Sequence, residues 1–240
     1  MAVIAFCGSM GSGKDTAADY LVNYHGYRRD SFASTLKDAV AVVFGWDRTM
    51  LEGRTAESRK WREKVDPWWA ARLDMPALTP RWVLQYWGTD VCRLGFHDDI
   101  WIASLENKIR KLSDNIVITD VRFPNEISAI RNAGGVVVQI QRGIEPEWHA
   151  DALAFNRGPS NNMRWALGRD RLEKLGIHAS ETAWIGQEFD YIITNNSSID
   201  DLFKQIEQLL VPGIIGNQVA AGPGQLQFVQ DSLTVSTHRL

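Results

Sequence analysis

Short apolar runs alternate with amphipathic stretches along most of the chain. Four of these runs have the length and continuity of strands that are buried on both faces of a parallel sheet. They lie at residues 2–7, 115–119, 136–140 and 191–194, and a further strand is expected around residues 27–33. Helical spacing predicts helices at residues 14–23, 35–44, 80–92, 100–112, 124–133 and 199–210. This alternation is typical of an α/β domain with a parallel sheet and right-handed crossovers.

Two segments interrupt the alternation. Residues 46–78 are charged, weakly periodic and broken by prolines, but they hold four of the ten tryptophans, which indicates a folded insertion rather than a disordered linker. Residues from about 142 to 188 are rich in arginine, and the irregular spacing of these arginines favours a lid that closes over phosphates. A charged surface loop is the alternative. We therefore expect one domain over residues 1–210, followed by a loosely ordered tail at 211–240.

Composition excludes several classes of partner. The formal charge of −3 provides no global basic field, so binding to nucleic acid or to a membrane surface is not expected, and an anionic ligand must be held by local cations. No run approaches the roughly 18 to 20 apolar residues of a membrane span, and the start of the chain has no signal-peptide pattern. A cytoplasmic location is therefore expected. The two cysteines, Cys7 and Cys92, are expected to be buried thiols in a reducing compartment.

A phosphate-binding loop lies between the first strand and the first helix. Residues 8–14 read Gly-Ser-Met-Gly-Ser-Gly-Lys and match G-x-x-x-x-G-K. The backbone of Gly11, Ser12 and Gly13 can converge on phosphate oxygens, and Lys14 can reach the β- and γ-phosphates of ATP. The alternative is a glycine turn that binds nothing.

The residues that follow the lysine depart from the common pattern. Asp15 stands where a serine or threonine hydroxyl usually binds Mg²⁺, and Thr16 comes one position later. Asp15 also suits the positive end of the helix dipole, so a capping role is the alternative to a role at the metal or at the acceptor.

Further candidates lie where strands end and helices begin. Asp120 and Arg122 follow a buried strand, and the carboxyl ends of parallel strands are where ligands bind in open α/β sheets. Asp120 could hold Mg²⁺ through water or bind the acceptor, and an ordinary turn is the alternative. Lys37 lies in the first turn of the helix at 35–44, where an acceptor phosphate could meet it; a surface lysine is the alternative.

The predicted helix at 80–92 offers a polar stripe. Arg81, Gln85 and Thr89 are spaced at i, i+4 and i+8, and Gly88 would let a ligand approach closely. Trp101, in the next helix, is more often a core residue than a platform for a base.

Taken in order, these segments resemble the bacteriophage-type deoxynucleoside monophosphate kinases, within the nucleoside monophosphate kinase-like P-loop proteins. The resemblance covers about residues 2–210. Its segments are Gly8–Thr16, Phe32–Asp38, Leu84–Gln85, Gly88–Asp90, Trp101, Thr119–Arg122, Asn125–Glu126, His178–Glu181 and Ile193–Asn196. The Gly-Lys-Asp-Thr order is itself a feature of that family. Met10 departs from it, because a basic residue that contacts the acceptor is expected at this position.

The resemblance implies a three-layer P-loop NTPase fold, with helices on both faces of the sheet and an inserted lid. It implies that Asn195 lies near the adenine of ATP, and that Thr16 and Asp15 bind the metal. The implied catalytic residues are Lys14, Asp120 and Arg122. The implied acceptor pocket consists of Lys37, Arg81, Gly88, Thr89, Asp90, Trp101, Asp120, Arg122 and Glu126.

The expected reaction is transfer of a phosphoryl group from ATP to a deoxynucleoside monophosphate, with Mg²⁺ and without a covalent enzyme intermediate. One rival is a P-loop kinase for another small acceptor, such as a coenzyme precursor or a sugar acid. A second rival is a non-enzymatic ATP-binding switch that docks a partner through the tryptophan-rich insertion. The insertion and the tail could alter oligomerisation, and a homodimer is compatible with this interpretation.

Overall fold

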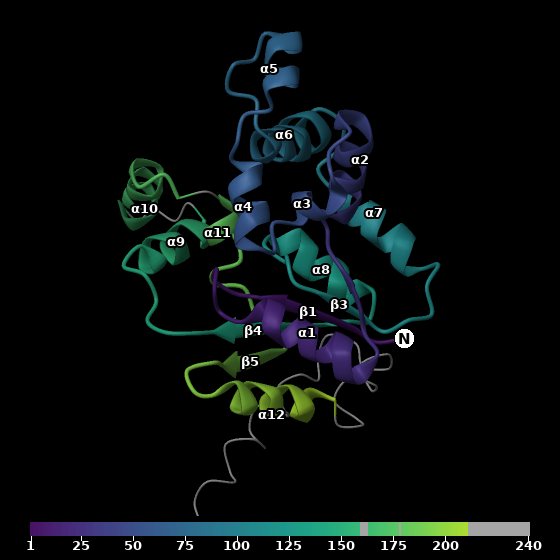
Figure 1. Ribbon diagram of the computed structural model, residues 1–240. Helices are drawn as coiled ribbons and strands as arrows, with labels where there is room; N and C mark the ends of the chain where they lie inside the picture. The colour runs from purple at the N-terminus through teal and green to yellow at the C-terminus, as the bar shows by residue number, and fades with distance from the viewer. Residues whose placement is uncertain (159–162, 178, 211–240) are drawn as a thin grey trace, which may run out of the picture.

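The computed structural model describes residues 1–158, 163–177 and 179–210 (Figure 1). The predicted tail at 211–240 and the family position His178 lie outside the described residues. No helix in the described part of the chain is long and apolar enough to cross a bilayer.

A parallel sheet forms the centre of the molecule, with the strand order β2-β3-β1-β4-β5. The strands are β1 (Val3–Cys7), β2 (Arg28–Asp30), β3 (Ile116–Ile118), β4 (Val136–Gln141) and β5 (Tyr191–Thr194). The central strand β1 pairs with β3 and β4, so that Ile4 lies opposite Val117 on one side and Val136 on the other. Because the strands are parallel, their carboxyl ends meet at one edge of the sheet.

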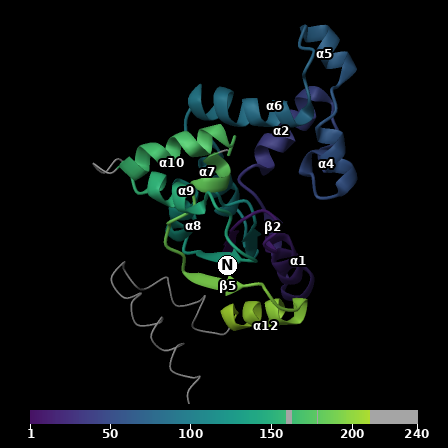
Figure 2. The same ribbon diagram turned by 90° about the vertical axis from the view of Figure 1, so that its left-hand side faces the viewer.

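Helices cover both faces of this sheet (Figures 1 and 2). Ile4 and Phe6 of β1 pack in a core with α1 (Lys14–His25) and α12 (Ile199–Leu209). The alternate β1 residues Val3, Ala5 and Cys7 pack in a second core with α7 (Ile100–Ile109) and α8 (Pro124–Asn132). The predicted three-layer α/β architecture is therefore confirmed.

A third core lies among the helices that connect β2 to β3. These helices are α2 (Ser34–Phe44), α3 (Arg48–Glu52), α4 (Ala56–Arg62), α5 (Pro67–Leu73) and α6 (Pro80–Tyr86). Trp46, Leu51 and Leu78 of the segment 46–78 are buried in this core with Val83 and Trp101. The segment is therefore folded, as its tryptophans indicated. Figure 2 shows α5 projecting from the rest of the molecule.

Local caps explain why the weakly periodic segment 46–78 forms helices. Asp47 accepts hydrogen bonds from the backbone N–H groups of Thr49 and Met50 at the start of α3. Asp66 does the same at the start of α5, where Pro67 occupies the first helical position. Such caps satisfy the donors that a helix start leaves unpaired. Short capped helices carry little amphipathic signal, which is why periodicity alone did not find them.

The predicted helix at 80–92 is not regular. α6 ends at Tyr86, and residues Trp87–Leu94 form a π-helix, η1. The Trp101 indole N–H donates to the Gly88 carbonyl oxygen (2.9 Å), and a side chain that takes a carbonyl out of the helix ladder favours a wider turn. Regular i, i+4 spacing therefore does not continue from Arg81 to Thr89.

Two smaller predictions are also corrected. The second strand is confined to residues 28–30, because the chain turns at Ser31 and α2 begins at Ser34. Cys92 is only partly buried, since it lies on the irregular turn of η1, whereas Cys7 is fully buried in β1. Both thiols are free in the structure.

The arginine-rich segment forms α9 (His149–Asn156), α10 (Met163–Lys174) and the short α11 (Ala179–Thr182). Phe155 of α9 stacks on Trp165 of α10, with ring centroids 5.8 Å apart. A Cβ atom on Gly168 would lie 2.7 Å from the Asp151 carbonyl oxygen, so the glycine lets the two helices approach closely. The predicted lid segment is thus a packed helical pair rather than a loop.

Candidate functional site

The phosphate-binding loop lies between β1 and α1, at the carboxyl edge of the sheet. Gly8, Gly11 and Gly13 have φ angles of 138°, 78° and 110°, a region that side chains with a Cβ rarely occupy. A Cβ atom on Gly8 would lie 2.3 Å from the Ile140 carbonyl oxygen of β4. The Ser12 hydroxyl oxygen is buried and has no hydrogen-bond partner among the described residues. These features suit a loop that wraps around an anion.

The Lys14 ammonium group is held inside this loop. Its Nζ donates to the carbonyl oxygens of Gly8 (2.8 Å) and Ser9 (2.7 Å). Burial lowers the pKa of Lys14, and the charge of Arg122 acts in the same direction, while Cys7 and Asp15 oppose it. No carboxylate of the described residues lies within ion-pair distance of Lys14, so its charge is available to a phosphate.

Asn195 braces the loop from β5. Its Nδ2 donates to the Ser12 carbonyl oxygen (2.8 Å), and the residue is buried. A Cβ atom on Gly13 would lie 2.4 Å from the same Nδ2. The structure therefore places Asn195 against the phosphate loop. Its predicted position beside the adenine stays a prediction.

Asp15 and Thr16 lie in the first turn of α1, and they differ in exposure. The Asp15 carboxylate is largely exposed and pairs with Arg29, whose Nη1 lies 3.0 Å from Asp15 Oδ1. Arg29 also pairs with Asp19 (2.9 Å), so the three residues tie β2 to α1. Thr16 is half-buried, two positions after Lys14. Of the two predicted metal ligands, Asp15 is thus the one that pairs with a cation.

Asp120 connects the end of β3 to the start of α2. Its Oδ1 and Oδ2 accept hydrogen bonds from the backbone N–H groups of Phe32 (3.1 Å) and Ala33 (3.2 Å). Burial raises the pKa of Asp120, while Lys37 and these N–H groups oppose that effect. The carboxylate thereby fixes the N-terminal turn that carries Lys37.

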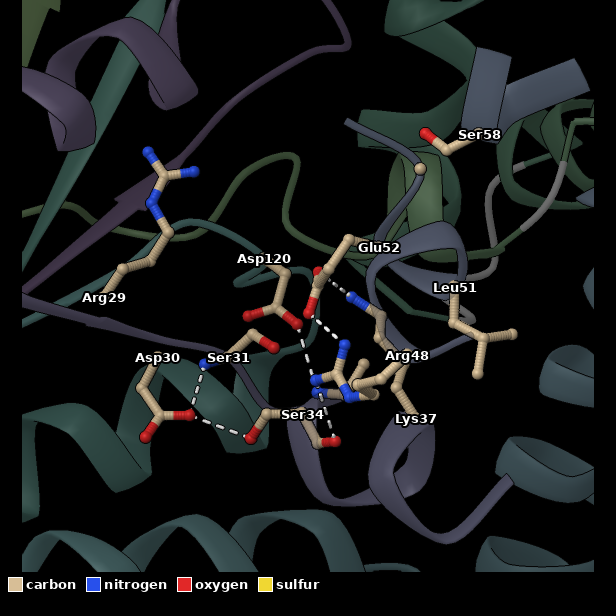
Figure 3. A network of polar contacts seen from close by, with 12 residues as sticks. Arg29, Asp30, Ser31, Ser34, Lys37, Arg48, Leu51, Glu52, Ser58 and Asp120 are labelled. Carbon is tan, nitrogen blue, oxygen red and sulfur yellow. Dashed lines mark hydrogen bonds and ion pairs between the residues drawn. The ribbon is translucent and has the colours of Figure 1, made fainter. Parts of the chain in front are cut away.

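Lys37 is held by an ion network on α3 (Figure 3). Its Nζ lies 2.7 Å from Glu52 Oε2, and Arg48 pairs with the other oxygen of the same carboxylate. Burial raises the pKa of Glu52, but Lys37 and Arg48 outweigh it and hold the pKa at about 2, below the ordinary value of 4.5. Glu52 therefore stays ionised and presents Lys37 near Asp120.

Glu126 is the centre of a second network, and its carboxylate is only 3% exposed. Oε2 accepts from the backbone N–H groups of Arg122 (2.8 Å) and Phe123 (3.1 Å), and Oε1 pairs with Arg93 (2.8 Å). Burial, with the charge of Asp120, raises the pKa of Glu126 to about 7. These contacts make Glu126 a residue that orients the Arg122 backbone rather than one that is open to a ligand.

Arg122 itself is exposed and points toward the lid helices. Its Nη1 donates to the Ser180 hydroxyl of α11 (3.1 Å). The charge of Arg122 also acts on Lys14 and on Asp120. Arg122 therefore contacts α11, and its charge acts both at the phosphate loop and at the end of β3.

The remaining predicted acceptor residues are less closely gathered. Arg81 is half-exposed and donates to Glu63 (2.8 Å), and Thr89 and Asp90 are exposed on η1. A Cβ atom on Gly88 would lie 2.9 Å from Leu36 Cδ2, so the close approach expected of a ligand is made by the α2 side chain. Trp101 is buried in the third core, in agreement with the expectation that it is a core residue.

Several lid arginines are paired within the lid. Arg171 Nη1 lies 3.2 Å from Asp151 Oδ2, and Arg169 pairs with Glu173 (2.9 Å). The first pair joins α10 to α9, and the second lies within α10. The predicted closing role of the lid arginines stays a prediction.

Sequence reasoning missed Arg93, Arg48 and Glu52. Arg48 and Glu52 are spaced at i, i+4, which is a readable signal for an ion pair on one helix face. Arg93 and Glu126 are 33 positions apart, and no local pattern announces their contact.

The described residues contain no group of three or more histidine, cysteine or acidic side chains that could hold a metal ion. This is compatible with Mg²⁺ bound in the way of phosphoryl-transfer sites, where phosphate oxygens and waters supply most ligands and the protein adds one or two. Thr16, at the start of α1, could supply one hydroxyl ligand of that kind.

Comparison with curated proteins gives two relatives of similar length. The chain is 29% identical to a putative deoxynucleotide monophosphate kinase of Acanthamoeba polyphaga mimivirus, over 86% of this chain and 94% of that one. It is 28% identical to the deoxynucleoside-5′-monophosphate kinase of Escherichia phage T5, over 74% of this chain and 85% of that one. No protein-family model matches the sequence. The resemblance to deoxynucleoside monophosphate kinases is thus confirmed over most of the chain.

Solved structures give looser similarities. A dephospho-CoA kinase from Campylobacter jejuni is 16% identical, covers 87% of this chain and 94% of its own, and has a TM-score of 0.40. The protein TT1252 from Thermus thermophilus is 16% identical, with 87% and 96% coverage and a TM-score of 0.37. These scores are too low to bear on function. The P-loop architecture rests on the sheet order and on the loop itself.

Proposed function

We propose that this protein transfers the γ-phosphoryl group of ATP to the 5′-phosphate of a deoxynucleoside monophosphate, which yields ADP and a deoxynucleoside diphosphate. The observation that carries the proposal is a phosphate loop with an unneutralised Lys14, in a chain that matches proteins named deoxynucleoside monophosphate kinases over most of its length. An oxygen of the acceptor phosphate attacks the γ-phosphorus. The bond from that phosphorus to the bridging oxygen of ADP breaks, and no general base is needed because the acceptor is already anionic.

The loop binds the phosphates of ATP in this proposal. The N–H groups of Gly11, Ser12 and Gly13 and the start of α1 face the β- and γ-phosphates, and Lys14 moves from the loop carbonyls to phosphate oxygens. Thr16 holds Mg²⁺, with Asp15 as the other predicted ligand. The ion neutralises charge that builds up on the phosphates when it is bound.

The acceptor phosphate meets cations from two elements. Lys37 at the start of α2 and Arg122 after β3 are the predicted contacts, and Asp120 positions α2 through the N–H groups of Phe32 and Ala33. Positioning and charge neutralisation supply most of the rate acceleration in phosphoryl transfer. Glu126 acts through Arg122, whose backbone it holds.

The matched relatives come from a virus and a phage. This origin supports a role in the host cytoplasm, in the supply of DNA precursors. Small-molecule substrates are the proposed partners. A homodimer stays a prediction.

The test is ADP release by the purified protein with Mg-ATP and a panel of deoxy- and ribonucleoside monophosphates. The expected result is turnover with at least one deoxynucleoside monophosphate. In the Lys14→Ala variant the rate should fall by at least about a hundredfold, because the variant loses the cation on the transferring group. Wild-type protein that binds ATP but is silent across the panel would contradict the proposal.

A further inference from the structure

The turn between α3 and α4 packs against an arginine that lacks a matched partner among the described residues. Arg62 ends α4, and its Nε is buried without a hydrogen-bond partner among the described residues. Its Nη1 reaches the Leu51 carbonyl oxygen at only 3.5 Å, the limit of a hydrogen bond. Buried guanidinium groups are normally satisfied by acceptors or carboxylates. The Arg62 Nε–H group therefore lacks a hydrogen-bond acceptor among the described residues.

The position of this guanidinium is built into the turn. It lies directly against Gly53, where a Cβ atom would be 2.0 Å from Arg62 Nη2 and 2.1 Å from Cζ. Gly53 also has a φ angle of 70°, which ends α3. On the other side, the capping box of Thr55 and buried Ser58 fixes the start of α4. The packing against Gly53 and the cap of α4 therefore fix the position of the Arg62 side chain.

The charges around Arg62 leave an excess of cations. Burial lowers the pKa of Arg62, and so do the charges of Arg81 and Arg59, while Glu63 and Glu52 oppose them. Both carboxylates are already engaged, because Glu63 pairs with Arg81 (2.8 Å) and Glu52 binds two other cations. A partly buried guanidinium with an unpartnered Nε, among like charges, is a site that an anion would stabilise.

The same turn reaches the predicted acceptor site. Glu52, next to Gly53 in the chain, holds Lys37, which lies near Asp120 at the end of β3. Figure 3 shows the Glu52 carboxylate between Asp120 and the side chains of Lys37 and Arg48. Glu52 therefore pairs with Lys37 of α2, and its charge also acts on Arg62, so the two cations have this carboxylate as a common neighbour.

We propose that Arg62 binds the phosphate of the monophosphate acceptor, as the cation that the insertion at 46–78 contributes to the acceptor site. This inference rests on the proposed function. A guanidinium donates paired, parallel hydrogen bonds to two oxygens of a phosphate monoester, which a lysine cannot reproduce. The phosphate supplies the acceptors that Arg62 lacks. The insertion thus takes part in substrate binding, in addition to its own packing around the tryptophans.

The test compares Arg62→Gln and Arg62→Lys with Lys60→Gln, which removes one charge from the exposed side of the same helix. Three quantities are measured: the KM for the preferred deoxynucleoside monophosphate, the KM for ATP, and the inhibition constant of the matching deoxynucleoside, which has no phosphate. Arg62→Gln should raise the KM for the deoxynucleoside monophosphate by about tenfold or more, because the variant loses charged hydrogen bonds to the phosphate. Arg62→Lys should recover part of that loss. The other two constants should stay within about twofold in every variant, since neither ligand presents a monoester phosphate to Arg62.

Either of two results would overturn the role of Arg62. One is an unchanged KM for the monophosphate in Arg62→Gln. The other is an equal loss of affinity for the deoxynucleoside, which would mean that the variant distorts the site and that Arg62 is only structural. If the wild-type protein shows no turnover with any monophosphate, the proposed kinase activity itself is contradicted, and Arg62 has no acceptor phosphate to bind.

Discussion

At the scale of single residues, the site divides into side chains that hold the backbone and side chains that are open to ligands. Asp120, Glu126 and Asn195 each hydrogen-bond to backbone groups of neighbouring segments, and Glu126 also pairs with Arg93. Among the described residues, the Lys14 side chain contacts two loop carbonyls and the Arg122 side chain contacts one hydroxyl. The second group is the one that we expect to meet phosphates.

The division explains what sequence reasoning could predict at this scale. The loop residues around Lys14 are contiguous, so their pattern is visible in the chain. The roles of Glu52 and Arg62 depend on a turn between two short helices, and that of Arg93 depends on a contact with Glu126 across 33 positions. The order of residue types along the chain does not reveal contacts of this kind.

Arg122 gives the first prediction. Arg122→Ala should raise the KM for the monophosphate by about tenfold or more and change the stability by less than about 0.5 kcal/mol, because the side chain is exposed and charged hydrogen bonds are lost only with the ligand. Initial rates and urea unfolding measure the two effects. Arg110→Ala, on the exposed end of α7, is the matched control. An unchanged KM would place Arg122 outside the acceptor site.

Glu52 gives a prediction about pH. Its pKa is about 2 in the fold and near the ordinary 4.5 when unfolded, so the ionised form stabilises the protein above pH 4.5, and that stability is lost as the pH falls from 4.5 toward 2. The Glu52 side chain is 26% exposed, which moderates the effect to on the order of 2 kcal/mol. Urea unfolding between pH 7 and pH 3 should therefore show a flatter acid limb for Glu52→Gln than for wild type. Equal slopes would contradict the ion network; Glu57→Gln, at an exposed position, is the control.

At the scale of elements, the long periodic strands and helices follow from the sequence, while the short or irregular ones do not. β1, β4 and α12 match their predicted ranges closely. The π-helix at 87–94 depends on a tertiary bond from Trp101 to Gly88, so the 3.6-residue pattern could not reveal it. The three helices of 46–78 begin at aspartate or threonine caps, end at a glycine, a glutamate and an aspartate, and are too short for a periodic signal.

The turn between α3 and α4 gives an element-scale prediction. Gly53 and Gly45 end their helices in the same left-handed conformation, with φ angles of 70° and 67°. Nothing lies near a Cβ atom on Gly45, whereas one on Gly53 would collide with the Arg62 guanidinium. Gly45→Ala should cost about 1 kcal/mol from backbone strain alone, and Gly53→Ala should cost about 1–3 kcal/mol more from overpacking.

Thermal and urea unfolding of both variants measure the difference. Gly53→Ala should also raise the KM for the monophosphate and leave the KM for ATP unchanged, because Gly53 follows Glu52 and packs against Arg62. Equal stability of the two variants would show that the guanidinium does not occupy its place against Gly53 in solution.

At the scale of the whole molecule, the described residues form three hydrophobic cores. Two cores lie on the faces of the sheet, and the third lies among α2–α6. α7 connects them, because Trp101 belongs to the third core and Ile102 and Leu105 to a core of the sheet. The alternation of strands and helices predicted the parallel sheet, the resemblance implied its three layers, and both are confirmed. The placement of the third core beside the carboxyl edge depends on tertiary packing.

The central claim is the transfer of phosphate between two nucleotides. The most direct measurement incubates the protein with ATP labelled on the γ-phosphate and an unlabelled deoxynucleoside monophosphate, then separates the products. We expect label in the deoxynucleoside diphosphate, in equal amount to the ADP formed. We expect almost no labelled product with Lys14→Ala, because that variant loses the loop cation. Label that appears only as inorganic phosphate, or that stays on ATP, would contradict it.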